Sequence, residues 1–146
     1  MRRARGIGLA VLLIATLSCA GCGTDRGFDD QVIAVLQDTG RSRLTIRELG
    51  APAGGEFLVV CPYETADSVE QRLGFVWSDA PDLRETDALQ ALITLDEDHD
   101  VASFTTFSRS RVDFCSEGRM WNLVPNEEEL EVVDSSTTLE VLLPPQ

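Results

Sequence analysis

Two of the four cysteines in this chain constrain its fold more than any other feature. Cys61 and Cys115 lie far apart in the sequence, whereas Cys19 and Cys22 lie close together near the N-terminus. A crosslink between Cys61 and Cys115 would close a loop of about 55 residues and stabilise the fold by roughly 4 kcal/mol on the chain-entropy model. Whether it forms depends on the compartment, which the N-terminal residues indicate.

Residues 1–21 have the pattern of a cleaved export signal. Three arginines precede an apolar stretch, residues 7–20, and small residues follow. This order of positive, apolar and small residues is typical of a secretory signal. The apolar stretch of about 14 residues is shorter than the roughly 20 that a membrane-spanning helix needs. We therefore predict that residues 1–21 are removed and that the protein is exported.

The segment Ala20-Gly21-Cys22 resembles the lipobox of bacterial lipoproteins, in which small residues precede a lipid-modified cysteine. The thiol accepts the lipid, and cleavage before Cys22 makes it the first residue of the mature protein. Cys19 stands where such a motif usually has leucine. The resemblance implies a protein held at the cell membrane by lipid on Cys22 and facing the extracytoplasmic side. The alternative is an ordinary cleaved secretory signal.

These assignments leave an even pair of cysteines. Cys19 leaves with the signal and Cys22 carries lipid, so Cys61 and Cys115 remain in an oxidising compartment. We predict that they form one disulfide. A metal site at Cys19 and Cys22 would need further ligands, and none lie near them in the sequence. We expect residues 22–28 to be a short tether.

The mature region is strongly acidic. It holds 9 arginines, no lysine and all 25 acidic residues, a net charge of −16. Such a charge argues against nucleic-acid binding, which requires a basic surface. It also argues against electrostatic adhesion to anionic lipid, so the lipid on Cys22 would be the only membrane anchor. A solubilising surface is the simplest interpretation, and a cationic partner is the alternative.

The hydrophobic pattern of residues 29–146 predicts a single small α+β domain. We expect an antiparallel-rich sheet of about four to five strands, with one or two helices packed on one face. Residues 57–61 are apolar throughout, as expected for a central strand buried on both faces. The acidic segment 126–131 is expected to be exposed. The other expected elements are helices at 29–36 and 65–73, the second capped by Thr65 or Asp67 and ended by Gly74, and strands at 44–49, 91–95, 101–107 and 138–143.

Residues 57–77, FLVVCPYETADSVEQRLGFVW, resemble a family of small, uncharacterised bacterial exported proteins and lipoproteins. In that family a strand ends in Pro-Tyr-Thr, a helix ends in Leu-Gly-x-x-Trp, and a hairpin leads to an arginine and Asp-Phe. Glu64 interrupts the Tyr-Thr pair here, and Gly54-Gly55 replace a usual Trp-Asp. The resemblance implies a small α+β fold and an envelope location, and no reaction. The matching residues, within about 43–115, are Pro62, Tyr63, Leu73, Gly74, Trp77, Arg109, Asp113 and Phe114.

The acidic segment 96–100, DEDHD, has aspartates at alternate positions, as the start of a calcium loop does. Val101 takes the place of the required glycine and Phe107 that of the closing glutamate, so we interpret the segment as a solvated hairpin turn. His99, the only histidine, lies in this turn, which is a poor place for a catalytic base. We therefore predict no metal, no cofactor and no catalytic residues.

Five residues remain as a candidate binding surface: Tyr63, Trp77, Arg109, Arg111 and Asp113. The aromatic residues bracket the second helix and could stack on a ligand or lie partly in the core. The arginines could contact a ligand or pair with a carboxylate as structural ties. The predicted function is that of a non-enzymatic binding module of the cell envelope with an envelope protein as partner. The alternatives are a carboxylate-dependent envelope hydrolase and a small-ligand carrier.

Overall fold

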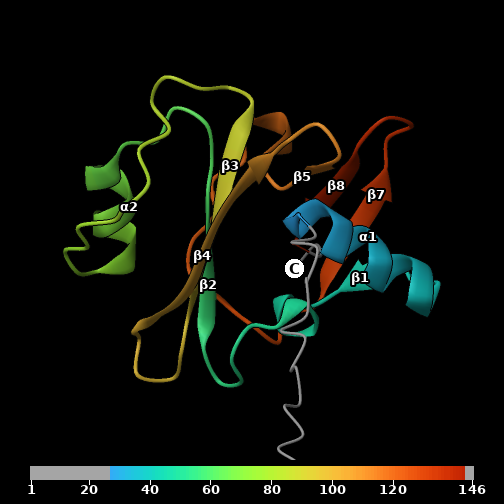
Figure 1. Cartoon of the computed structure of the whole chain (residues 1–146), viewed down its shortest axis with the longest axis horizontal. Helices are drawn as coiled ribbons and strands as arrows, with labels where there is room; N and C mark the ends of the chain where they lie inside the picture. Colours follow the sequence, from blue (N-terminus) through green and yellow to red (C-terminus); the bar gives the residue numbers. More distant parts are fainter. Residues whose placement is uncertain (1–26, 144–146) are drawn as a thin grey trace, which may run out of the picture.

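The structure is a computed structural model that describes residues 27–143; the predicted signal, Cys22 and the tether up to residue 26 lie outside the described residues. An α+β domain rich in antiparallel pairing is confirmed (Figure 1). Within residues 27–143, no helix has the length and apolarity needed to cross a membrane. In chain order the elements are α1 (Phe28–Thr39), β1 (Arg43–Leu44), η1 (Ile46–Leu49), β2 (Glu56–Val60), α2 (Ala66–Leu73), β3 (Leu89–Leu95), β4 (Val101–Ser108), β5 (Val112–Asp113), η2 (Ser116–Gly118), β6 (Val124–Pro125), β7 (Leu130–Asp134) and β8 (Leu139–Leu142).

The strands form two sheets rather than one. The central sheet has the order β4-β3-β2-β6, and the second sheet has the order β1-β7-β8-β5. All pairs are antiparallel except β5 with β8. Strand β2 is the reason for the second layer, because its residues from Phe57 to Val60 are all fully buried. A strand that is apolar on both faces needs cover on both, which confirms the prediction for residues 57–61.

The two faces of the central sheet belong to different cores. Leu58 and Val60 face the core that α2 closes with Val69, whereas Phe57 and Val59 face a larger core with Trp121. Helix α1 and the second sheet close this larger core. The helices therefore lie on opposite sides of the central sheet instead of sharing one face (Figure 1).

Residues 44–49 correct the sequence-based expectation of an edge strand. Only Leu44 belongs to a strand, and Thr45 is the N-cap of η1. The Thr45 hydroxyl accepts a hydrogen bond from the Glu48 amide at 3.2 Å, and the Glu48 carboxylate accepts one from the Thr45 amide at 2.8 Å. This reciprocal capping box offers the backbone a local alternative to the sheet, and it outweighs the alternating pattern of the segment.

The acidic segment 126–131 is a second correction. Asn126 and Leu130 are fully buried, and β7 begins at Leu130. The Asn126 side chain donates hydrogen bonds to the carbonyl oxygens of Pro52 and Leu95, at 2.9 and 3.3 Å. The glutamates between these two residues remain outside the core. The acidic composition therefore predicts the exposure of the middle of the segment but not the burial of its ends.

Helix α2 begins and ends where the sequence predicts. The Thr65 hydroxyl accepts a hydrogen bond from the Ser68 amide, and Gly74 ends the helix in the left-handed conformation at φ 84°. The Glu70 carboxylate accepts a hydrogen bond from the Trp77 amide at 2.8 Å. That contact fixes the chain as it leaves the helix.

Candidate functional site

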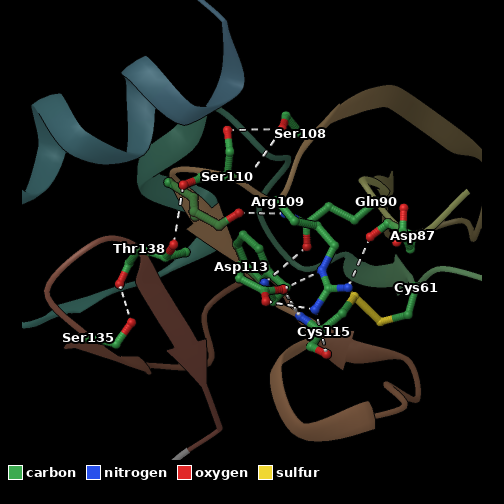
Figure 2. A network of polar contacts seen from close by, with 12 residues as sticks. Cys61, Asp87, Gln90, Ser108, Arg109, Ser110, Asp113, Cys115, Ser135 and Thr138 are labelled. Carbon is green, nitrogen blue, oxygen red and sulfur yellow. Dashed lines mark hydrogen bonds and ion pairs between the residues drawn. A yellow bond between two sulfur atoms is a disulfide. The ribbon is translucent and has the colours of Figure 1, made fainter.

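Cys61 and Cys115 form a disulfide, as predicted, with their Cα atoms 5.6 Å apart. Cys61 follows β2 directly and Cys115 lies two residues after β5, so the bond ties the central sheet to the second sheet (Figure 2). Both residues are buried, at 6% and 3% exposure. The bond is the fixed point around which the neighbouring side chains are arranged.

Arg109 and Asp113 form a bidentate ion pair beside this bond (Figure 2). Nε of Arg109 lies 3.0 Å from one carboxylate oxygen and a terminal nitrogen lies 2.8 Å from the other. Arg109 also donates to the carbonyl oxygens of Asp87 and Cys115, and Asp113 accepts the Cys115 amide at 2.7 Å. The hydrogen bonds from Asp113 raise the pKa of the Arg109 guanidinium above its ordinary value. Both residues therefore act as structural ties that hold Cys115 in place.

A cavity of about 360 Å³ lies over the disulfide, and we call it the disulfide cavity. Two large side chains at its rim are mostly exposed, Tyr63 at 66% and Met120 at 68%. Its lining residues are Cys61, Pro62, Tyr63, Glu64, Arg109, Cys115, Gly118, Arg119 and Met120.

The backbone on both sides of the disulfide cavity is strained. Tyr63 has φ 69°, and Glu117 has φ 59°, next to the lining residue Gly118. Left-handed backbone costs free energy in residues other than glycine, and such residues gather at functional sites. The Tyr63 amide donates to the Leu83 carbonyl at 2.9 Å, which helps to hold this conformation.

Glu64 maintains the turn below Tyr63. This residue is only 8% exposed. Its carboxylate accepts the Cys61 amide at 2.7 Å and forms an ion pair with Arg72 of α2. Arg72 in turn donates to the Trp121 carbonyl at 2.6 Å. The sequence contains no local signal for this network, because its partners come from three separate segments.

Arg119 differs from every other described arginine. Of the eight arginines in residues 27–143, seven form ion pairs with acidic side chains. Arg119 has no such partner among the described residues, although the chain has far more acidic than basic residues. It lines the disulfide cavity beside Met120. Neither residue belongs to the binding surface predicted from the sequence. Arg119 could not be singled out there, because the pairing of the other arginines depends on the fold.

The structure divides the five residues of the predicted binding surface among three places. Tyr63, Arg109 and Asp113 gather at the disulfide cavity, with Asp113 reaching it through Arg109. Arg111 instead binds the carboxylates at the start of α1, at distances of 3.0 and 2.6 Å. Trp77 packs edge-on against an aromatic ring of β4.

The acidic segment 96–100 is the turn of the β3–β4 hairpin, as predicted. The Asp96 carboxylate accepts hydrogen bonds from the amides of Asp98 and Asp100, each at 3.0 Å. Backbone amides of the turn therefore already occupy this carboxylate. His99 is 65% exposed in its side chain and lies 3.3 Å from Glu56. Within the described residues, no group of three or more His, Cys, Asp or Glu side chains is placed to hold a metal ion.

Comparison of the chain with family models, with curated proteins and with solved structures finds no match.

Proposed function

We propose that this chain is a lipid-anchored protein of the bacterial cell envelope that works as a non-enzymatic binding module. The disulfide cavity is its binding surface. One observation carries this proposal: Arg119, with no acidic partner among the described residues, lies at the same cavity as the exposed Tyr63 and Met120.

This combination suits a ligand group with an apolar part and an anionic end. A guanidinium binds carboxylate or phosphate oxygens through paired hydrogen bonds. A tyrosine ring and a methionine thioether supply apolar contact area that adapts to shape. Each of the other described arginines is paired with at least one carboxylate, so Arg119 is the one arginine of residues 27–143 whose charge an external anion meets without such competition.

The surroundings of the cavity favour binding by a preformed surface. The disulfide and the Arg109–Asp113 pair fix its floor, and Glu64 fixes the turn that carries Tyr63. A surface that is already ordered loses less conformational entropy when a partner binds. The Tyr63 ring is mostly exposed on a strained backbone, so it does not fill the core. This position suits a residue that contacts a partner.

The location rests on the N-terminal sequence and on the resemblance of residues 57–77 to small envelope proteins. The test is to fractionate cells that express Cys22→Ser, with Cys19→Ser as the matched control. The first protein should leave the membrane fraction and the second should stay. Retention of both would contradict the anchor on Cys22, and release of both would point to faulty export instead.

The binding surface is tested by crosslinking the lipidated protein in its own membrane and isolating the products. Arg119→Gln and Tyr63→Ala should each lower the yield of the partner severalfold. Arg43→Gln is the matched control, because it removes the same charge from an exposed ion pair on β1. Equal yields from all variants would place the binding surface elsewhere. Turnover of an envelope substrate that is lost on replacement of one carboxylate would favour the hydrolase alternative.

A further inference from the structure

Strand β4 is an edge of the central sheet, and within residues 27–143 its cover is partial: a bulge lies near Ala102, and Phe28 of α1 packs on Phe107. Among residues 27–143, β3 is the only strand that pairs with it. Its sequence, VASFTTFS, contains no charged residue and no proline. Natural proteins usually protect long edges with lysine, proline, a bulge or a covering segment. Here the register shifts only near Ala102, and residues 103–108 pair regularly with β3 and with no second strand among residues 27–143 (Figure 1).

One face of this edge borders a groove of about 590 Å³, which we call the edge groove. Ser103, Thr105 and Phe107 of β4 line one side of it. The first turn of α1, with Phe28 packed on Phe107, and Ile46 and Leu49 of η1 are among its other lining residues. The edge groove offers both hydroxyl groups and apolar surface. It therefore suits partner side chains that are partly polar and partly apolar. The edge groove shares no lining residue with the disulfide cavity.

The other face of the edge carries an aromatic pair. Phe104 is 41% exposed, and its ring packs edge-on against Trp77 with the ring centres 5.6 Å apart. The Glu70 carboxylate holds the Trp77 backbone in place. An added strand would send alternate side chains to opposite faces. One set would enter the edge groove and the other would lie against Phe104.

We propose that β4 accepts an extended, cationic segment of a partner protein as an additional strand of the central sheet. Backbone hydrogen bonds to residues 103–108 supply the affinity, and the edge groove and the aromatic pair select the side chains. This surface is separate from the disulfide cavity, so the inference goes beyond the proposed function and either can fail alone.

Charge decides between the candidate occupants of this edge. The turn before β4 carries four acidic residues, and the carboxylates of Glu97 and Asp98 are not engaged by any described arginine. At the other end, Arg109 and Arg111 are neutralised by their own carboxylates. A second copy would bring another strongly acidic chain to the same edge, and the like charges would repel. A segment with basic side chains at the end beside the turn has complementary charge.

The experiment uses short synthetic peptides of alternating threonine and valine, with lysines at one end or glutamates in their place. The mature protein should bind the lysine peptide, and hydrogen exchange of the amides of residues 103–108 should slow. Its dissociation constant should rise with salt, because screening weakens exposed charge contacts. The glutamate peptide should bind more weakly by a factor of ten or so.

Matched variants locate the charge. Glu97→Gln with Asp98→Asn should raise the dissociation constant of the lysine peptide severalfold, whereas Asp79→Asn with Glu85→Gln should leave it unchanged. Thr106→Lys places a positive charge on the edge and should weaken binding, and Thr137→Lys is its control. All four positions of the neutralising variants are outside the cores, so these proteins should fold normally.

Several results would overturn the proposal. Equal affinity for the lysine and glutamate peptides, or no protection of residues 103–108, would rule out a cationic partner segment at this edge. Protection without peptide, together with a concentration-dependent dimer in sedimentation, would assign the edge to a second copy. Protection without peptide in a monomer, lost when residues 22–26 are deleted, would assign it to the chain's own N-terminal residues.

Discussion

Glu64 shows how one charged side chain can join several parts of this molecule. It accepts the Cys61 amide after β2 and pairs with Arg72 of α2, which also donates to the carbonyl oxygens of Val59 and Trp121. Both side chains are largely withdrawn from solvent, at 8% and 14% exposure. A buried pair of this kind adds little net stability over an apolar pair, but loss of one partner leaves the other charge unpaired.

We therefore expect Glu64→Ala to lower the free energy of unfolding by about 3–5 kcal/mol. The measurement is urea unfolding of the purified mature protein at neutral pH. The double variant Glu64→Gln with Arg72→Met should be more stable than Glu64→Ala, because it leaves no unpaired charge. A single variant as stable as the wild type would mean that water replaces the carboxylate at no cost.

Gly55 occupies a position where no side chain fits. A Cβ atom there would lie 1.9 Å from the carbonyl oxygen of Leu95 on the neighbouring strand. Gly55→Ala should cost about 1–3 kcal/mol through overpacking. Gly50→Ala is the comparison, since φ 99° there is strained for alanine but no atom lies within 4 Å of the added carbon. Gly50→Ala should cost about 1 kcal/mol. A larger loss of thermal stability for Gly50→Ala than for Gly55→Ala would contradict the close approach at Gly55.

At the scale of elements, η1 depends on the ionised form of one carboxylate. The hydrogen bond from the Thr45 amide, more than the nearby Arg41, lowers the pKa of Glu48 below its ordinary value of 4.5. A lowered pKa in the folded state means that this stabilisation is complete above pH 4.5. It is lost as the pH falls through the lower folded value.

Acid unfolding tests this dependence. Glu48→Gln should lower stability at neutral pH and should have a smaller effect at a pH below the lowered pKa of the folded state, because the carboxylate is then protonated in both the folded and the unfolded state. Urea unfolding of the variant and the wild type at neutral and acid pH gives the two differences. Glu85→Gln, an exposed change outside η1, serves as the control. Equal differences at both pH values would exclude the ionised capping box.

The sequence predicts those elements that depend on their own residues. The uninterrupted apolar run at 57–61 and the Thr65 and Gly74 signals around α2 identify a central strand and a helix directly. Strand β7 escapes prediction because Leu130 is buried by pairing with Leu44, far away in the chain. The cysteine pair of the candidate site follows from the count of cysteines. Arg119 does not, because it stands out only when the partners of all other described arginines are known.

At the scale of the whole molecule, one disulfide joins the two sheets within residues 27–143. The bond joins residues 54 positions apart. Replacement of both Cys61 and Cys115 by alanine should lower the free energy of unfolding by about 4 kcal/mol, as the loss of constraint on the unfolded chain requires. Urea unfolding with and without a reductant measures it: the reductant should destabilise the wild type and leave the double variant unchanged. A wild type whose stability does not change with the reductant would contradict this assignment.

On the proposal that the disulfide cavity binds a partner, binding would require the disulfide below Tyr63 and Arg119, and therefore export. In a reducing cytosol the two thiols would stay separate, and the segments that carry Tyr63 and Arg119 would lose the bond that sets their spacing. A copy that has not been delivered would hold every contact residue without the finished surface. On the same proposal, such a copy would not bind in the cytosol and would bind only after the disulfide had formed.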